Sequence, residues 1–216
     1  METIQNHKLN QVFPLVYYVN LTERKDRKKD IERELENHQI HAERFEAIKE
    51  EEARIGCWKS HLEILKKARE QNCPVFIFED DAQILEYQNY TIENVLGDLE
   101  KTEWDMFYLG GNILRPFFQT TEYLARLTHC QSTHAYGVNT QILDPLIKTI
   151  EQTPGLHLDV IYADRVVPHV KAYISVPMLA IQRESFSDIE KVSMNYNLPT
   201  KRYYHYLIPK NKEKDA

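Results

Sequence analysis

The stretch Pro74-Val75-Phe76-Ile77-Phe78-Glu79-Asp80-Asp81 decides the fold, because an apolar, β-prone run ends abruptly in three acids. Such a run is typical of a buried strand in an α/β sheet, where ligands bind at the carboxyl ends of the strands. Three carboxylates there repel one another unless a cation or a proton shares the site. Oxygen ligands suit hard ions, so the stretch predicts a site for Mn²⁺ or Mg²⁺ and a phosphorylated ligand. The simpler alternative is a polar loop that caps the next helix.

Patterns typical of strands and helices alternate on both sides of this stretch. Strands are expected at 15–19, 42–47, 75–78, 104–109, 135–138 and 170–176, and helices at 24–38, 60–69, 91–99, 142–150 and 158–167. This order predicts an α/β fold, a Rossmann-like three-layer sandwich with a mostly parallel central sheet. We expect a single domain over residues 1–216, with flexible ends at 1–12 and 208–216.

Composition narrows the class of protein. The chain has 216 residues, 42% of them hydrophobic, and a net charge of -6, which argues against a nucleic-acid partner. It has no run of 18 apolar residues and no apolar signal core near its start, so a cytoplasmic location is expected. Basic residues gather at 24–29 and 201–214, where they fit a solvated surface or peripheral contact with an anionic membrane.

The three cysteines, Cys57, Cys73 and Cys130, have no zinc-like spacing. They are interpreted as buried small residues in a reducing compartment.

Four sequence blocks together resemble glycosyltransferase family 25, which includes lipooligosaccharide and collagen galactosyltransferases. In chain order the blocks are Tyr18-Val19-Asn20-Leu21 with Arg24 and Arg27, Arg44-Phe45-Glu46-Ala47 with the run from Ile55 to His61, the run from Phe78 to Ala82, and Gln182 with Ser187-Asp188-Ile189. They span most of the chain, from 17 to 189, in the order in which the family has them. The sequence departs from the family pattern at Arg54 and at Trp58-Lys59, which leaves the donor-side contacts open.

The resemblance implies an A-type glycosyltransferase fold and a metal-dependent, inverting hexosyltransferase. The donor would be a UDP-sugar carrying galactose or glucose, and the acceptor a hydroxyl of a glycan, a lipid-linked saccharide or a protein. The alternative is a catalytically inactive sugar-binding or scaffold protein that keeps the fold. Release of UDP without an acceptor separates the two hypotheses.

Metal ligands are expected among the acids. Residues two apart on an extended segment point the same way, so Glu79 and Asp81 should converge on the ion, while Asp80 faces another way, towards the ribose. The resemblance adds Asp188, whose simpler role would be a helix cap. A divalent ion between these carboxylates and the donor diphosphate stabilises the charge that develops as the sugar leaves.

The donor-binding residues are expected to be Asn20, Arg24, Arg27, Ser60, His61 and Asp80. Guanidinium groups bind phosphate in two-point contacts, although ion pairs within the helix explain the arginines as well. Ser60 could instead cap a helix together with Glu63, and His61 could serve the core.

An acceptor hydroxyl must lose its proton to a base within hydrogen-bond reach. Asp159 and Asp164 are the candidates, and Asp159 resembles an aspartate of the family in this region. A helix cap is the competing role for Asp159.

Overall fold

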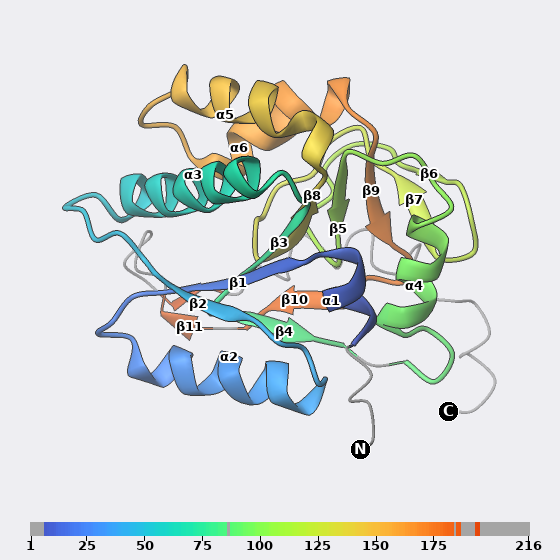
Figure 1. Ribbon diagram of the computed structural model, residues 1–216, viewed down its shortest axis with the longest axis horizontal. Helices are drawn as coiled ribbons and strands as arrows, with labels where there is room; N and C mark the ends of the chain where they lie inside the picture. The colour runs from blue at the N-terminus through green and yellow to red at the C-terminus, as the bar shows by residue number, and fades with distance from the viewer. Residues whose placement is uncertain (1–6, 86, 184, 187–192, 195–216) are drawn as a thin grey trace.

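The apolar run before the acids is strand β3 (Val75–Glu79) of an eight-stranded sheet, in a computed structural model that describes residues 7–85, 87–183, 185–186 and 193–194 (Figure 1). In spatial order the sheet consists of β2 (Glu43–Glu46), β1 (Leu15–Asn20), β3, β8 (Ala135–Val138), β5 (Met106–Tyr108), β9 (Ala172–Ser175), β7 (Leu124–Arg126) and β6 (Phe118–Gln119). All strands expected from the sequence are therefore found, within a residue or two of their expected bounds.

Most strands of this sheet point the same way. The pairings of β1 with β2 and β3, and of β5 with β9, are parallel. Strand β8 is antiparallel to both of its neighbours, β3 and β5, and β7 is antiparallel to both β9 and β6. Strands β8 and β7 thus run against the other six, which confirms the mostly parallel sheet.

Helices cover both faces of the sheet, as the continuous burial of its central strands requires (Figure 1). One face packs on α3 (Ala53–Gln71), α5 (Leu143–Glu151) and α6 (Leu158–Ile161), and takes Tyr17, Val19, Val75 and Ile77 from β1 and β3. The other packs on α1 (Lys8–Val12), α2 (Lys25–Asn37) and α4 (Ile92–Leu99), and takes Val16, Tyr18, Phe76 and Phe78. This confirms the three-layer α/β sandwich.

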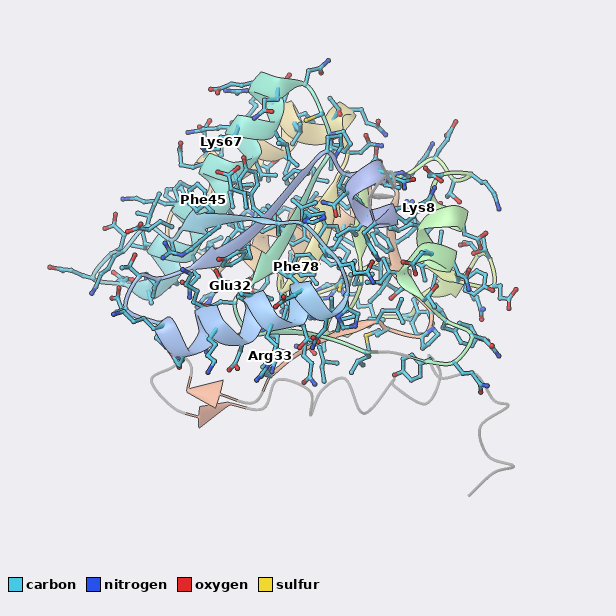
Figure 2. All side chains as sticks on the ribbon, turned by 60° about the horizontal axis from the view of Figure 1, so that its bottom comes forward. Lys8, Glu32, Arg33, Phe45, Lys67 and Phe78 are labelled. Atoms are coloured by element: carbon cyan, nitrogen blue, oxygen red, sulfur yellow. The ribbon has the colours of Figure 1, made fainter. Side chains whose placement is uncertain are left out.

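Figure 2 shows the second of these layers from the side of α2. Phe78 lies in the interior beneath α2, where its side chain is fully buried. Lys67 and Arg33 lie on outward helix surfaces. Burial of one large apolar side chain such as Phe78 stabilises the fold by about 1.5–3 kcal/mol.

Helix α3 differs most from expectation, because it begins at Ala53 rather than at Ser60. Ser60 therefore lies inside the helix, and the predicted capping box with Glu63 is wrong. The first turn has no side-chain cap and contains Gly56, so the sequence gives no start signal there. The helix expected at 158–167 is α6 followed by a π-helical turn, η2 (Tyr162–Val166), and a 3-10 turn, η3 (Val167–His169).

Several short elements have no strong sequence pattern. Helix α1 occupies residues that were expected to belong to a flexible end, but its Leu9 is fully buried, so that part of the expectation is wrong. Residues 208–216 lie outside the described part of the chain. A 3-10 turn, η1 (Thr140–Ile142), precedes α5, and two small sheets pair β10 (Ala180–Gln182) with β4 (Ala82–Ile84) and β11 (Ser185–Phe186) with β12 (Ser193–Met194). Among the described helices, none is both long enough and apolar enough to cross a membrane.

Gly137 on β8 offers a test of how tightly the α1 layer packs. A Cβ at this position would overlap the ring of Phe13 and lie 3.1 Å from Cδ2 of Phe76. Overpacking of this kind costs about 1–3 kcal/mol, so Gly137→Ala should lower the free energy of unfolding by that amount in urea titration.

Gly97→Ala is the matched control, because a Cβ at that position in α4 meets nothing within 4 Å. It should raise the free energy of unfolding by about 0.5–1 kcal/mol, since alanine favours a helix over glycine. Equal effects of the two substitutions would contradict the packing described for β8.

Candidate active site

A cavity of about 380 Å³ lies where β1 and β3 end, between α2 and the start of α3. Its walls are formed by the end of β1 and the residue after it, Glu23 and Arg27, the loop from Ala47 to Ala53, and Cys57 and His61 of α3. Glu79, Asp80 and Asp81 line it together with Gln182 of β10. The carboxyl end of a central parallel strand thus opens into a cavity, as the sequence predicted.

The two-residue period of β3 distributes the acids between the two helical layers. Glu79 has the same parity as Val75 and Ile77, so its carboxylate lies on the side of α3. Asp80 has the parity of Phe78 and meets Arg27 on α2. The chain leaves the strand at Asp80 and turns through Asp81, which therefore does not continue the alternation and also lies against Arg27.

One arginine and one asparagine hold the two aspartates. Arg27 donates from Nη1 to Asp80 Oδ1 at 2.9 Å and to Asp81 Oδ2 at 3.4 Å. Asn20, at the end of β1, donates to Asp80 Oδ2 at 2.8 Å and to the carbonyl of Arg24 at 3.1 Å, and accepts from Arg44 Nε at 3.2 Å. These contacts join the ends of β1, β2 and β3 to the start of α2.

The acids are crowded and short of positive charge. Burial and then the charge of Asp81 raise the pKa of Glu79 well above its ordinary value, and a hydrogen bond from Thr133 Oγ1 at 2.6 Å offsets this only in part. Burial also raises the pKa values of Asp80 and Asp81, despite the nearby Arg27. Asp81 Oδ1 is buried and has no hydrogen-bond partner among the residues that the structure describes. A divalent cation would relieve this repulsion and supply the missing partner.

Two neighbouring stripes of residues on helix α3 have different roles at the cavity: one holds Ile48, and the other lines the cavity. Gly56 and Ser60 hold Ile48, because Ser60 Oγ accepts from Ile48 N at 2.8 Å and a Cβ on Gly56 would overlap the carbonyl oxygen of Ile48. Ser60 Oγ also donates to the carbonyl of Gly56 at 2.7 Å, and the residue is fully buried outside the cavity lining. The structure thus gives Ser60 a positioning role and does not bring it to the predicted donor site.

Cys57 and His61, which directly follow Gly56 and Ser60 in the sequence, line the cavity. His61 is fully buried, and burial lowers its pKa to about 3, so the ring is neutral. Its Nδ1 lies 2.9 Å from the hydroxyl of Tyr136, which is 3.2 Å from the hydroxyl of Tyr162. Its Nε2 lies 3.7 Å from Glu79 Oε1, beyond hydrogen-bond reach.

The two candidate bases lie in different surroundings. Asp159, in the first turn of α6, accepts from the backbone of Val160 at 2.9 Å and of Ser132 at 3.3 Å, and its charge contributes to the raised pKa of Glu79. Asp164, on η2, is half exposed and lies 3.3 Å from His129 Nε2 and 3.8 Å from Arg115. Asp159 therefore lies close enough to influence Glu79 at the end of β3, whereas Asp164 pairs with groups at the surface.

Of the other predicted residues, one is not brought to the cavity and one is not among the described residues. Arg24 makes the simpler contact expected of it, a two-point ion pair with Asp26 at 2.9 and 3.1 Å, and is not part of the cavity lining. Asp188 lies outside the described residues. Asn20, Arg27, His61 and the three acids do meet at the cavity.

Sequence reasoning did not assign Thr133 or Cys57 to the site. Thr133 binds Glu79 from the loop before β8, a contact across the sheet that no local pattern signals. Cys57 stands four residues before His61, and that helical spacing was available in the sequence. The glycine pair at 110–111 serves packing, since added Cβ atoms would overlap Ala180 and Cys130.

Comparison with known sequences now identifies the family. The sequence model described as "Glycosyltransferase family 25 (LPS biosynthesis protein)" matches residues 51–178, which are 128 of the 216 residues. The chain belongs to glycosyltransferase family 25. The matched range contains the run from Ile55 to His61 and the run from Phe78 to Ala82, both of which carried the resemblance. The expectation of a glycosyltransferase is confirmed at the level of the family.

Individual proteins are similar to this family 25 chain either over a short stretch or at low sequence identity. Procollagen galactosyltransferase 1-A of Xenopus laevis is 41% identical over 59 residues, which are 26% of this chain and only 10% of that protein. The crystal structure of A197 from STIV has a TM-score of 0.50 at 10% identity and covers 84% of this chain and 93% of that one. At this identity the likeness concerns the fold alone. A glycosyltransferase involved in the glycosylation of the major capsid of PBCV-1 has a TM-score of 0.43 at 11% identity, over 74% and 80% of the two chains.

His134, whose carbonyl accepts from the backbone of Glu79 at 2.9 Å, gives a test of this region. Burial lowers its pKa from 6.5 to about 4, so as the pH falls the unfolded chain takes up the proton first. Stability is therefore full above pH 6.5 and falls below it, by about 2 kcal/mol per such histidine at pH 5. His134→Gln should reduce this loss in urea unfolding at pH 7.5 and 5.0.

His169→Gln is the control, because that side chain is exposed. It should leave the difference between the two pH values unchanged. A pH dependence that is the same in wild type and His134→Gln would contradict a buried, neutral His134.

Proposed function

We propose that this family 25 chain is a metal-dependent, inverting hexosyltransferase that moves galactose or glucose from a UDP-sugar to a hydroxyl of a glycan, a lipid-linked saccharide or a protein. The observation that carries the proposal is the cluster of Glu79, Asp80 and Asp81 on the wall of a cavity. A single arginine, Arg27, contacts two of these acids in the described part of the chain. The cluster therefore binds a cation more readily than an anion.

The donor set fits a hard divalent ion. Carboxylate oxygens are the preferred ligands of Mn²⁺ and Mg²⁺, and Asp81 Oδ1 is a buried oxygen to which no described residue donates a hydrogen bond. Glu79 and Asp81 are the proposed ligands here, and Asp188 is the proposed third ligand. A bound ion would stabilise the negative charge of the departing diphosphate.

The residues around the acids would hold the donor. Arg27 and Asn20 fix the aspartates, and both line the cavity together with His61 and Asp80, which supports a role for these four residues near the nucleotide. Lys49, on the opposite wall, adds a positive charge that pairs with Glu23. Arg24 and Ser60 are proposed to act through the backbone that they position, since neither lines the cavity.

The attack on the sugar requires a base on the acceptor side, and we assign that role to Asp159. Its carboxylate is fixed by two backbone N–H groups, that of Val160 in α6 and that of Ser132 in the loop before β8. A carboxylate positioned in this way can take the proton of the acceptor hydroxyl as the hydroxyl oxygen attacks the anomeric carbon.

The type of sugar rests on similarity. The relative from Xenopus laevis is named a galactosyltransferase, and the family description refers to lipopolysaccharide biosynthesis. Both support a hexose donor and a saccharide or protein acceptor for this chain. A screen of UDP-sugars for hydrolysis, with and without Mn²⁺, would identify the donor without knowledge of the acceptor.

The metal site predicts a joint effect of UDP and Mn²⁺ on thermal unfolding. Together they should raise the melting temperature more than either does alone, because a ligand at a hundred times its Kd stabilises the folded state by about 2.7 kcal/mol. Asp81→Asn should abolish the joint effect and the Mn²⁺-dependent hydrolysis of the donor.

Asp144→Asn is the matched control, since that carboxylate is 82% exposed on α5, and it should behave like wild type. If UDP and Mn²⁺ at millimolar concentrations gave no joint stabilisation of the wild type, the proposed donor site would be wrong.

Asp159→Asn tests the base. It should lower the rate of transfer by roughly 10²–10⁴-fold, because a neutral amide cannot accept the proton. The joint stabilisation by UDP and Mn²⁺ should remain, since Asp159 is not a proposed ligand of the ion. Transfer rates are measured with the donor found in the screen, with Asp164→Asn as the comparison variant. A larger loss in Asp164→Asn than in Asp159→Asn would reverse the assignment.

A further inference from the structure

A second set of potential ligands lies beside the carboxylate cluster and has a different chemistry. Cys57 and His61 are four residues apart on α3, so their side chains share one face of the helix. Glu79 reaches the same point from the end of β3. The sulfur of Cys57, a ring nitrogen of His61 and a carboxylate oxygen of Glu79 all lie within 4.8 Å of one another.

His61 is already arranged as a ligand. Its ring is fully buried, and within the described part of the chain Nε2 has no hydrogen-bond partner, although His61 lines the cavity. With the proton on Nδ1, His61 donates to the Tyr136 hydroxyl, which in turn donates to Tyr162. That tautomer leaves the lone pair of Nε2 directed away from the tyrosines. Histidines that bind metals are typically oriented by such a contact through their other nitrogen.

An unpartnered nitrogen in this position needs an explanation, because burying a polar atom without a partner costs about 1–3 kcal/mol. Glu79 Oε1, at 3.7 Å, is too far away to satisfy it by a hydrogen bond. The distance instead matches a shared cation, because tetrahedral zinc separates its nitrogen, oxygen and sulfur ligands by roughly 3.4–3.6 Å.

We propose that Cys57, His61 and Glu79 bind a thiophilic divalent cation of the Zn²⁺ class, with a fourth position open to the cavity. Mixed sulfur, nitrogen and oxygen ligands favour zinc over Mn²⁺ or Mg²⁺, which take oxygen ligands. Binding would replace the proton of the Cys57 thiol, which is released to solvent. The cation would then lie between the carboxylate of Glu79 and the sulfur of Cys57.

This site differs from the proposed Mn²⁺ site in its ligands, although both use Glu79. It requires no nucleotide-sugar and no transfer reaction, so its test is independent of the proposed function. The site also gives Cys57 a role other than that of a buried small residue. The sequence shows no zinc-like spacing around Cys57, because Glu79, the third ligand, comes from the end of β3 and not from a nearby cysteine or histidine.

Titration of the metal-free, reduced full chain with Co²⁺ tests the proposal. Co²⁺ bound to a thiolate gives a near-ultraviolet charge-transfer absorption, which Zn²⁺ should remove by displacing the cobalt. The wild type is expected to show this absorption at one equivalent of metal. Cys57→Ser should lose the absorption and bind Zn²⁺ at least about tenfold more weakly, measured by competition with a chelator.

Cys73→Ser is the matched control, since Cys73 is also partly buried but lies beyond the far end of α3. It should keep both the absorption and the affinity, and Asp81→Asn should keep the absorption as well. The proposal is overturned if the wild type shows no thiolate absorption, or if Cys57→Ser retains it. The wild-type result decides the question alone if Cys57→Ser does not fold, as judged by circular dichroism.

Discussion

The arrangement depends on one electrostatic constraint, the burial of three adjacent carboxylates at the end of a strand. Asp80 and Asp81 are 8% and 7% exposed, and Glu79 is only partly accessible. Carboxylates in such surroundings stay charged only when nearby groups compensate them. Three of the elements that meet at this point supply part of that compensation: β1 an amide, α2 a guanidinium and the loop before β8 a hydroxyl. The positive charge that is still lacking makes the cavity suited to cations.

The alternation of side chains along β3 places the carboxylates of Glu79 and Asp80 in two different chemical environments. Asp80 points to the layer of α2 and is held by hard, charged and amide partners. Glu79 points to the layer of α3 and meets a thiol and an imidazole. Asp81 lies in the turn after the strand, and its carboxylate also meets Arg27 on the side of α2.

Much of this could be predicted from the sequence. The apolar run 75–78 followed by acids predicted β3 and its position at a cavity, and Thr91 with its apolar pattern predicted α4, whose start it caps at 3.3 Å. Interactions between distant segments could not be predicted. The start of α3 has no capping side chain, and the role of Ser60 depends on Ile48, which reaches it only in the folded chain. The antiparallel direction of β8 likewise depends on its partners across the sheet.

The contact of α3 with Ile48 has a consequence for how ligands bind. Ile48 is fixed at its amide by Ser60, and its carbonyl oxygen occupies the space that any side chain at position 56 would need. The loop that carries Lys49 is thereby joined to a 19-residue helix. A nucleotide entering the cavity would meet a wall that has already lost its conformational entropy during folding. Little of the binding free energy would then be spent on ordering that loop, so affinity at this wall depends chiefly on shape and charge.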